Sequence, residues 1–262
     1  MPSANDLLTV ATTAAKAAGA YLRSVERRDP AAWTPKGRAD WATDVDRTSE
    51  AIISRILREA TPDSRIVGEE LSPDVVTEGL VWVVDPLDGT TNFLHGYPSY
   101  AVSIAAAQGG VLEAAAVLHV PLDRMTTATR GGGAYEGATR LAVSTIGAPE
   151  HALIGTGFPY REFARLEPYL DQLSRVVLGA TGVRRPGSAA IDLADVAAGR
   201  FDGFWEQRLS TWDIAAGILL VREAGGRVTD FGGRDLGIEH SEVVAGNQPI
   251  HRWLLEVLQD HA

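Results

Sequence analysis

The chain contains no cysteine, which excludes disulfide bonds, thiolate zinc sites and cysteine nucleophiles. Its six histidines are scattered and never show His-x-x-x-His spacing, so a histidine-based metal site is not expected. No apolar run reaches about 18 residues, and the first residues do not form a basic segment followed by an apolar one. We therefore expect a soluble, cytoplasmic protein that does not enter a membrane.

Positive charge is scarce as well. Acidic residues outnumber basic ones by 34 to 24, and the formal net charge is −10. A dedicated nucleic-acid-binding protein usually presents a basic surface, so direct nucleic-acid binding is not expected. The same negative charge would repel an anionic substrate, unless a metal ion reverses the field locally.

Hydrophobic periodicity divides the chain into two patterns. Helical spacing predicts a helix over residues 5–28 and a second one ending near residue 60, with a polar, irregular segment over residues 33–46 between them. Alternation over residues 100–107 and 111–120 predicts a hairpin that turns at Gly109 and Gly110, and further strands follow to about residue 143. From residue 162, predicted helices at 162–178, 189–198, 212–223 and 248–258 are interspersed with strands at 201–206, 227–231 and 242–245. We expect one unit over residues 1–262 with two lobes, an α+β lobe at about 1–145 and an α/β lobe at about 146–262, and a cleft between them.

Two carboxylates stand at the end of a strand-like apolar segment. Val81 to Val84 predict a buried strand, and Asp85 and Asp88 follow it. Pro86 cannot donate to a sheet ladder, so we expect the chain to turn there and to bring both acids to one point, with the Leu87 carbonyl between them. Ligand sets made only of oxygen suit Mg²⁺, Mn²⁺ or Ca²⁺.

Other acids stand at the ends of further predicted elements. Glu69 follows a short strand, and Asp213 lies where a helix should begin. If these acids share a cleft with Asp85 and Asp88, they could not all stay ionised without cations. Each acid taken alone has a simpler explanation, since acids favour helix N-termini. Gly89 and Thr90 could likewise hold phosphate with their N–H groups, or simply form a turn with a helix cap.

Several motifs, taken in order, resemble those of the inositol monophosphatase family of the bacterial type. They are Asp40–Asp46, Gly68-Glu69-Glu70, Trp82–Phe93, Gly155–Tyr160, Arg184–Ala190, and Trp212–Gly217 followed by Glu223–Gly226. The resemblance extends from about residue 36 to residue 226. Lys36 matches a family lysine near the cleft, although it stands one residue closer to Asp40.

The resemblance implies a layered αβαβα sandwich and an inositol-phosphate phosphatase that requires two to three Mg²⁺ ions per site. Mn²⁺ would substitute, and Ca²⁺ or Li⁺ would inhibit. By position, Glu69, Asp85 and the Leu87 carbonyl would hold one ion, and Asp85, Asp88 and Asp213 a second. Thr90 and Asp46, with Glu69, would activate the water that attacks phosphorus directly, without a phosphoenzyme. The implied substrate contacts are Asp88, Gly89, Thr90, Ser188, Ala189, Glu206 and Asp213.

The motifs do not decide which alcohol leaves. Inositol monophosphate and related polyol phosphates are favoured, because a glutamate at position 206 suits two neighbouring hydroxyl groups. Histidinol phosphate, fructose 1,6-bisphosphate, 3′-phosphoadenosine phosphate and NADP are alternatives within the same fold. A role mainly as a regulatory partner of the transcription machinery is a further alternative. The family also implies a homodimer.

Overall fold

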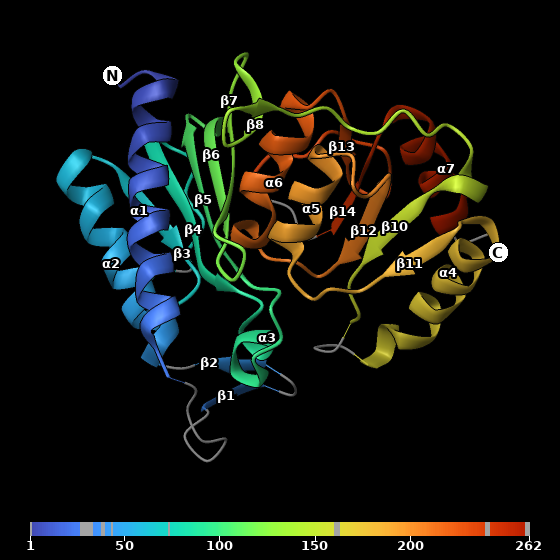
Figure 1. Cartoon of the computed structure of the whole chain (residues 1–262), viewed down its shortest axis with the longest axis horizontal. Coiled ribbons are helices and arrows are strands. Elements are labelled where there is room, and N and C mark those ends of the chain that lie inside the picture. Colours follow the sequence, from blue (N-terminus) through green and yellow to red (C-terminus); the bar gives the residue numbers. More distant parts are fainter. Residues whose placement is uncertain are drawn as a thin grey trace.

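The computed structural model describes residues 2–26, 34–37, 40–42, 44–72, 74–159, 163–238 and 242–259. These residues form seven α-helices, two large β-sheets and one small sheet (Figure 1). Within the described ranges, no helix combines the length and apolarity that crossing a bilayer requires.

The larger sheet follows the sequence order of its strands, from β3 to β9. β3 and β4 are parallel, and every later pair is antiparallel. The predicted hairpin is confirmed, since β5 and β6 pair through a turn at Gly109 and Gly110, which both have positive φ. The strands are β3 (Arg65–Gly68), β4 (Leu80–Asp88), β5 (Ala101–Gln108), β6 (Val111–His119), β7 (Arg124–Thr129), β8 (Gly133–Glu136) and β9 (Thr139–Arg140).

The central strands of this sheet are buried on both faces. Trp82 and Val84 of β4 face helices α1 (Ala4–Ser24) and α2 (Asp44–Ala60), whose apolar faces complete one core. Val81 and Val83 alternate to the other face, where they join a core formed with α5 (Ala189–Ala197) and α6 (Thr211–Glu223). A strand covered on both faces reads as a continuous apolar run, which explains the sequence of β4.

The second sheet has the strand order β11-β10-β12-β14-β13. β10 pairs in parallel with β11 and β12, whereas β14 is antiparallel to β12 and β13. Helices α4 (Leu166–Gly179) and α7 (Gln248–Leu258) cover its outer face and complete a third core. The strands are β10 (Leu153–Thr156), β11 (Gly182–Arg184), β12 (Gly203–Gln207), β13 (Arg227–Thr229) and β14 (Glu242–Gly246), and short 3₁₀ helices lie at Pro149–His151 and Phe163–Arg165.

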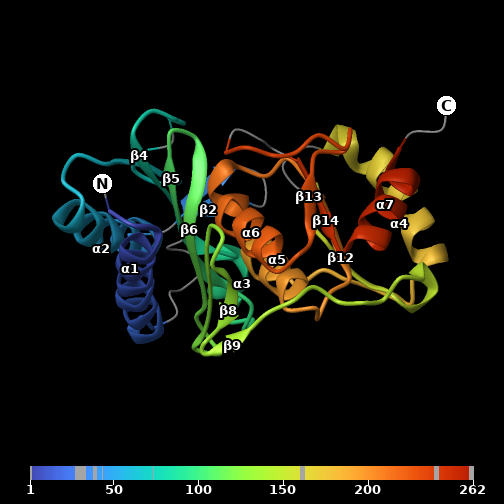
Figure 2. The same cartoon turned by 90° about the horizontal axis from the view of Figure 1, so that it is seen from above.

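Five layers result, and Figure 2 shows them edge-on. α1 and α2 form the first layer and the seven-stranded sheet the second, α5 and α6 lie in the middle, and the five-stranded sheet and then α4 and α7 complete the stack. The expected αβαβα sandwich is confirmed. The division into lobes near residue 145 stays a prediction.

Some predicted elements differ from the structure. The first helix ends at Ser24 and not at residue 28, since its C-cap residue Val25 has an extended backbone (φ −80°, ψ 124°) and packs partly buried against the core. Residues 27 and 28 lie outside the described residues. The segment 33–46, predicted to be irregular, contains the antiparallel strands β1 (Thr34–Gly37) and β2 (Asp40–Ala42) and the start of α2. β10 and β11 were not predicted, since each is short and contains glycine, which is depleted in strands.

Candidate active site

A β-bulge in β4 brings Asp85 and Asp88 together. Asp85 pairs with Ser103 and Asp88 with Ala101, so three steps along β4 match two along β5. Residues three apart in a regular strand point to opposite faces, and the extra residue of a bulge corrects this. The expected turn at Pro86 is wrong, since β4 continues to Asp88; proline is accommodated because bulges lack the regular ladder bond.

A third carboxylate reaches the same place from helix α6. Asp213 is the third residue of α6, and its Oδ2 accepts the N–H of the N-cap residue Ser210 at 2.6 Å. Carboxylate oxygens of Asp85, Asp88 and Asp213 lie within 4.8 Å of one another. Helix capping and membership of the acidic cluster therefore both apply to Asp213.

The three acids line a cavity of about 340 Å³. All but one of the predicted site residues line it: Glu69, Asp85, Leu87, Asp88, Gly89, Thr90, Ser188, Ala189, Glu206 and Asp213. Asp46 is buried and is not among the lining residues, and its Oδ1 accepts a hydrogen bond from Thr90, which lines the cavity. The side chain of Lys36 lies outside the described residues.

The acids in the cluster raise one another's pKa. Burial raises the pKa of Asp85 well above its usual range, and the charges of Glu69, Asp88 and Asp213 add to the effect. Burial also raises the pKa of Asp88 to about 6, although hydrogen bonds from Ser188 and Ala190 act in the opposite direction. A divalent cation would relieve this repulsion. The donors are hard oxygens, so Asp85, Asp88 and Asp213, with Glu69 and the Leu87 carbonyl nearby, fit Mg²⁺.

Thr90 connects the cavity to a buried acid. It is the first residue of α3 (Thr90–His95), and its hydroxyl lies 3.0 Å from Asp46 Oδ1 and 3.1 Å from the Leu87 carbonyl oxygen. Gly89 precedes it with φ 93°, and a Cβ atom there would lie 2.9 Å from the Ser99 carbonyl oxygen. Only glycine fits this turn, which places the Thr90 hydroxyl at the cavity wall.

Ser188 holds Asp88 in place. Its hydroxyl donates to Asp88 Oδ2 at 2.6 Å, and the Ala190 N–H donates to the same oxygen at 2.7 Å. Ser188 is also the N-cap of α5. The structure thus gives Ser188 a clear bond to a candidate metal ligand, and its contact with a substrate stays a prediction.

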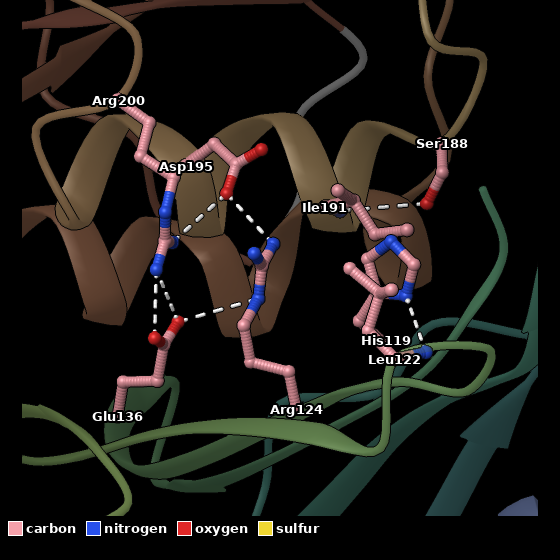
Figure 3. A network of polar contacts seen from close by, with 8 residues as sticks. All are labelled: His119, Leu122, Arg124, Glu136, Ser188, Ile191, Asp195 and Arg200. Carbon is pink, nitrogen blue, oxygen red and sulfur yellow. Dashed lines mark hydrogen bonds and ion pairs between the residues drawn. The ribbon is translucent and has the colours of Figure 1, made fainter. Parts of the chain in front are cut away.

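The other end of α5 is fixed by ion pairs, which Figure 3 shows together with Ser188. Asp195 of α5 pairs with Arg124 at 2.9 Å and with Arg200 at 3.0 Å. Both arginines also pair with Glu136 of β8, at 3.3 and 2.7 Å. This network ties the helix that carries Ser188 to the edge region of the larger sheet.

Two features of the cavity wall were not predicted from the sequence: the role of Asn92, and the contact between Arg185 and Phe158. All three residues line the cavity. The Asn92 amide donates to the carbonyl oxygens of Ser99, at 2.6 Å, and Pro186, at 2.8 Å, and so joins the α3 turn to the segment before α5. The Arg185 guanidinium lies 5.4 Å from the centre of the Phe158 ring. The position of Asn92 directly after Thr90 and Thr91 was the available signal.

Comparisons with known proteins agree with one another. The sequence model of the inositol monophosphatase family matches residues 3–262. The Nus factor SuhB of Pseudomonas aeruginosa is 46% identical over 97% of this chain and 96% of its own length. The inositol-1-monophosphatase of Rhizobium meliloti is 47% identical over 86% of this chain and 85% of its own. The crystal structure of the extragenic suppressor protein suhB from Bartonella henselae has a TM-score of 0.89 and 39% identity, with 98% of this chain and 99% of that chain covered.

Proposed function

Because this chain belongs to the inositol monophosphatase family, we propose that it is a Mg²⁺-dependent phosphatase that hydrolyses inositol monophosphate and related polyol phosphates. The observation that supports this most directly is the meeting of Asp85, Asp88 and Asp213 within 4.8 Å at the wall of one cavity. The relative from Rhizobium meliloti, named an inositol-1-monophosphatase, supports the choice of substrate.

The proposed metal ligands are Glu69, Asp85, the Leu87 carbonyl, Asp88 and Asp213. When bound, divalent cations would supply Lewis-acid activation of water and neutralise charge on the phosphate and on the departing oxygen. The bulge in β4 gives Asp85, Leu87 and Asp88 a rigid support, because β4 is buried on both faces. We expect Mn²⁺ to substitute for Mg²⁺, and Li⁺ or Ca²⁺ to inhibit.

Thr90 and Asp46 are proposed to take a proton from the attacking water. The Thr90 hydroxyl has one hydrogen, which it can donate to Asp46 Oδ1 at 3.0 Å. Its oxygen can then accept a hydrogen bond from water, so that the proton passes through Thr90 toward Asp46. Glu69 faces the same cavity and would assist. The backbone N–H groups of Gly89 and Thr90 would hold phosphate oxygens.

Glu206 and Ala189 are proposed to contact the alcohol part of the substrate. Glu206 of β12 lies directly against Gly157, where any Cβ atom would collide with its carboxylate. This packing fixes the acid at the cavity wall, where it could accept hydrogen bonds from two neighbouring hydroxyl groups of a polyol. Phe158 and Arg185, which line the same cavity, would then select among alcohols.

The decisive experiment measures phosphate release from five substrates with and without Mg²⁺: inositol monophosphate, histidinol phosphate, fructose 1,6-bisphosphate, 3′-phosphoadenosine phosphate and NADP. Asp85→Asn should lower kcat/KM at least about 100-fold, because it removes a charged ligand from the cluster. Asp63→Asn, at an exposed position, is the matched control and should behave as the unchanged protein. Full activity of Asp85→Asn at saturating Mg²⁺ would refute the metal assignment, and equal activity on all five substrates would refute the polyol assignment.

A second candidate function is a role as partner of the transcription machinery. Relatives named Nus factor SuhB are as similar to this chain as those named inositol-1-monophosphatase, at 46% and 47% identity. Rescue of a deletion strain by the Asp85→Asn variant, together with co-purification of RNA polymerase, would favour this candidate. Failure of that variant to rescue would favour hydrolysis as the essential role. We also propose a homodimer in the cytoplasm, which sedimentation and cell fractionation can test.

A further inference from the structure

Helix α2 presents three buried polar side chains to the back of the cavity. Asp46, Ser49 and Glu50 are each at most 1% exposed, and their spacing places them on one face of the helix. Asp46 accepts from Thr90, and the Ser49 hydroxyl donates to the Pro86 carbonyl oxygen at 2.9 Å, inside the bulge of β4. Two of the three therefore already contact parts of the candidate site.

Glu50, the third of them, grips the turn that follows Glu69. Its Oε2 accepts the N–H of Glu70 at 2.7 Å, and its Oε1 accepts the N–H of Leu71 at 3.1 Å. Gly68 lies against the same carboxylate, since a Cβ atom at this position would be 2.7 Å from Glu50 Cδ. Two carboxylate oxygens thus hold two successive N–H groups, and the chain before Glu69 packs directly on them.

Stability alone does not explain a fully buried carboxylate beneath this turn. Removing a carboxylate from water costs several kcal/mol, which hydrogen bonds only partly offset. The turn itself is superficial, since Leu71 is 52% exposed. An apolar residue on α2 would avoid that cost and leave the N–H groups of Glu70 and Leu71, which lie in this superficial turn, to bind water. What the carboxylate adds is a fixed orientation for the backbone on either side of Glu69.

We propose that Glu50 is a positioning residue for Glu69. Its carboxylate fixes the turn of residues 68–71, so that the Glu69 side chain faces Asp85 and Asp88 across the cavity. This inference rests on the proposed function, in which Glu69 holds a metal ion. Loss of the grip should therefore weaken Mg²⁺ binding more than it slows turnover by the Mg²⁺-saturated protein.

The test compares Glu50→Gln with Glu59→Gln, an exposed glutamate on the same helix that serves as the matched control. Glutamine keeps one acceptor and places an NH₂ group against the other N–H. In calorimetry, Glu50→Gln should bind Mg²⁺ about tenfold more weakly than the unchanged protein, because hydrogen bonds to charged groups are strong. The Mg²⁺ concentration for half-maximal phosphate release should rise by the same factor, with kcat within about twofold. Unchanged Mg²⁺ affinity in Glu50→Gln would overturn the proposal.

A double variant separates positioning from a general structural effect. If Glu50 acts through Glu69, Glu50→Gln should weaken Mg²⁺ binding no further when Glu69→Gln is already present. Additive losses would overturn the proposal. If Glu50→Gln does not fold, as judged by thermal unfolding, Glu50→Asp replaces it in both comparisons with the same expectations. Because calorimetry needs no substrate, a protein that hydrolyses none of the five phosphate esters would refute the proposed function while the Mg²⁺ affinities still decide the role of Glu50.

Discussion

Replacing Ser188 by alanine should weaken Mg²⁺ binding at acidic pH and leave it nearly unchanged at alkaline pH. The Ser188 hydroxyl donates to Asp88 Oδ2 at 2.6 Å and helps to hold the pKa of Asp88 at about 6, against the opposite effect of burial. A carboxyl group must lose its proton before it binds a cation. Without the hydroxyl, the pKa of Asp88 rises, so a higher pH is needed to free the ligand.

The size of the effect follows from the bond. A hydrogen bond to a charged group contributes about 1.5 to 3 kcal/mol, and the lower value applies because Asp88 is only half-buried. Since about 1.4 kcal/mol corresponds to a tenfold change, the acid limb of Mg²⁺ affinity should move up by about one pH unit. Above about pH 8 the ligand is ionised in both proteins, and the two curves should meet.

Calorimetric Mg²⁺ titrations from pH 5 to pH 9 measure this shift, and the pH dependence of phosphate release gives an independent check. Ser188→Thr keeps the hydroxyl and should retain the original acid limb. Ser188→Gly removes the hydroxyl but is a tolerated N-cap, so it should shift the limb with a smaller loss of stability than Ser188→Ala. Coincident acid limbs for Ser188→Ala and the unchanged protein would refute the assignment of this bond.

Three further predictions concern stability. Burial raises the pKa of Asp192 well above its usual value, so the folded protein keeps a proton that the unfolded chain releases above about pH 4, and the free energy of unfolding falls as pH rises. Asp192→Asn should flatten this fall when urea unfolding is measured at several pH values. Parallel curves for the variant and the unchanged protein would contradict the prediction. Gly89→Ala should lower the free energy of unfolding by more than about 2 kcal/mol, because the new Cβ atom meets the Ser99 carbonyl oxygen. Gly79 also has positive φ but no atom near the position of a Cβ, so Gly79→Ala should cost only about 1 kcal/mol. Equal losses would exclude the close contact as the cause. Arg124→Ala breaks two ion pairs of the network in Figure 3 and should lower the free energy of unfolding by roughly 2 kcal/mol. The control Arg55→Ala, at an exposed ion pair, should lower it by less than about 0.5 kcal/mol. Equal losses of stability in thermal unfolding would show that the network is not stabilising.

The elements that the sequence predicts well are those whose periodicity extends over many residues. The β5–β6 hairpin and the long helices have repeated apolar positions and clear turn residues. The strands β1 and β2 pair with each other and lie close in the chain, but at four and three residues they are too short to show alternation. The strands β10 and β11 pair with partners that are distant in the chain, so local pattern could not reveal them. Their formation is a result of tertiary packing.

The candidate site was predictable as a set of residue types and not as a geometry. The motifs predicted that Asp85, Asp88 and Asp213 share one site, and in the structure their carboxylate oxygens lie within 4.8 Å of one another. Proline at position 86 suggested a chain break, because sequence alone does not distinguish a turn from a bulge inside a continuing strand. Partners such as Glu50 were missed, since a glutamate on an amphipathic helix normally faces solvent.

Helices α5 and α6 are synthesised after the sheet that they cover. β9 ends at Arg140, whereas α5 begins at Ala189 and α6 ends at Glu223. At ordinary elongation rates, the ribosome therefore completes α5 and α6 roughly 4 to 17 seconds after the seven-stranded sheet whose inner face they cover. During that time the nascent chain exposes valine and alanine side chains that the finished protein buries completely. We expect a fragment that stops near residue 145 to aggregate or to bind chaperones. The middle helical layer therefore determines when the growing chain can bury this apolar face.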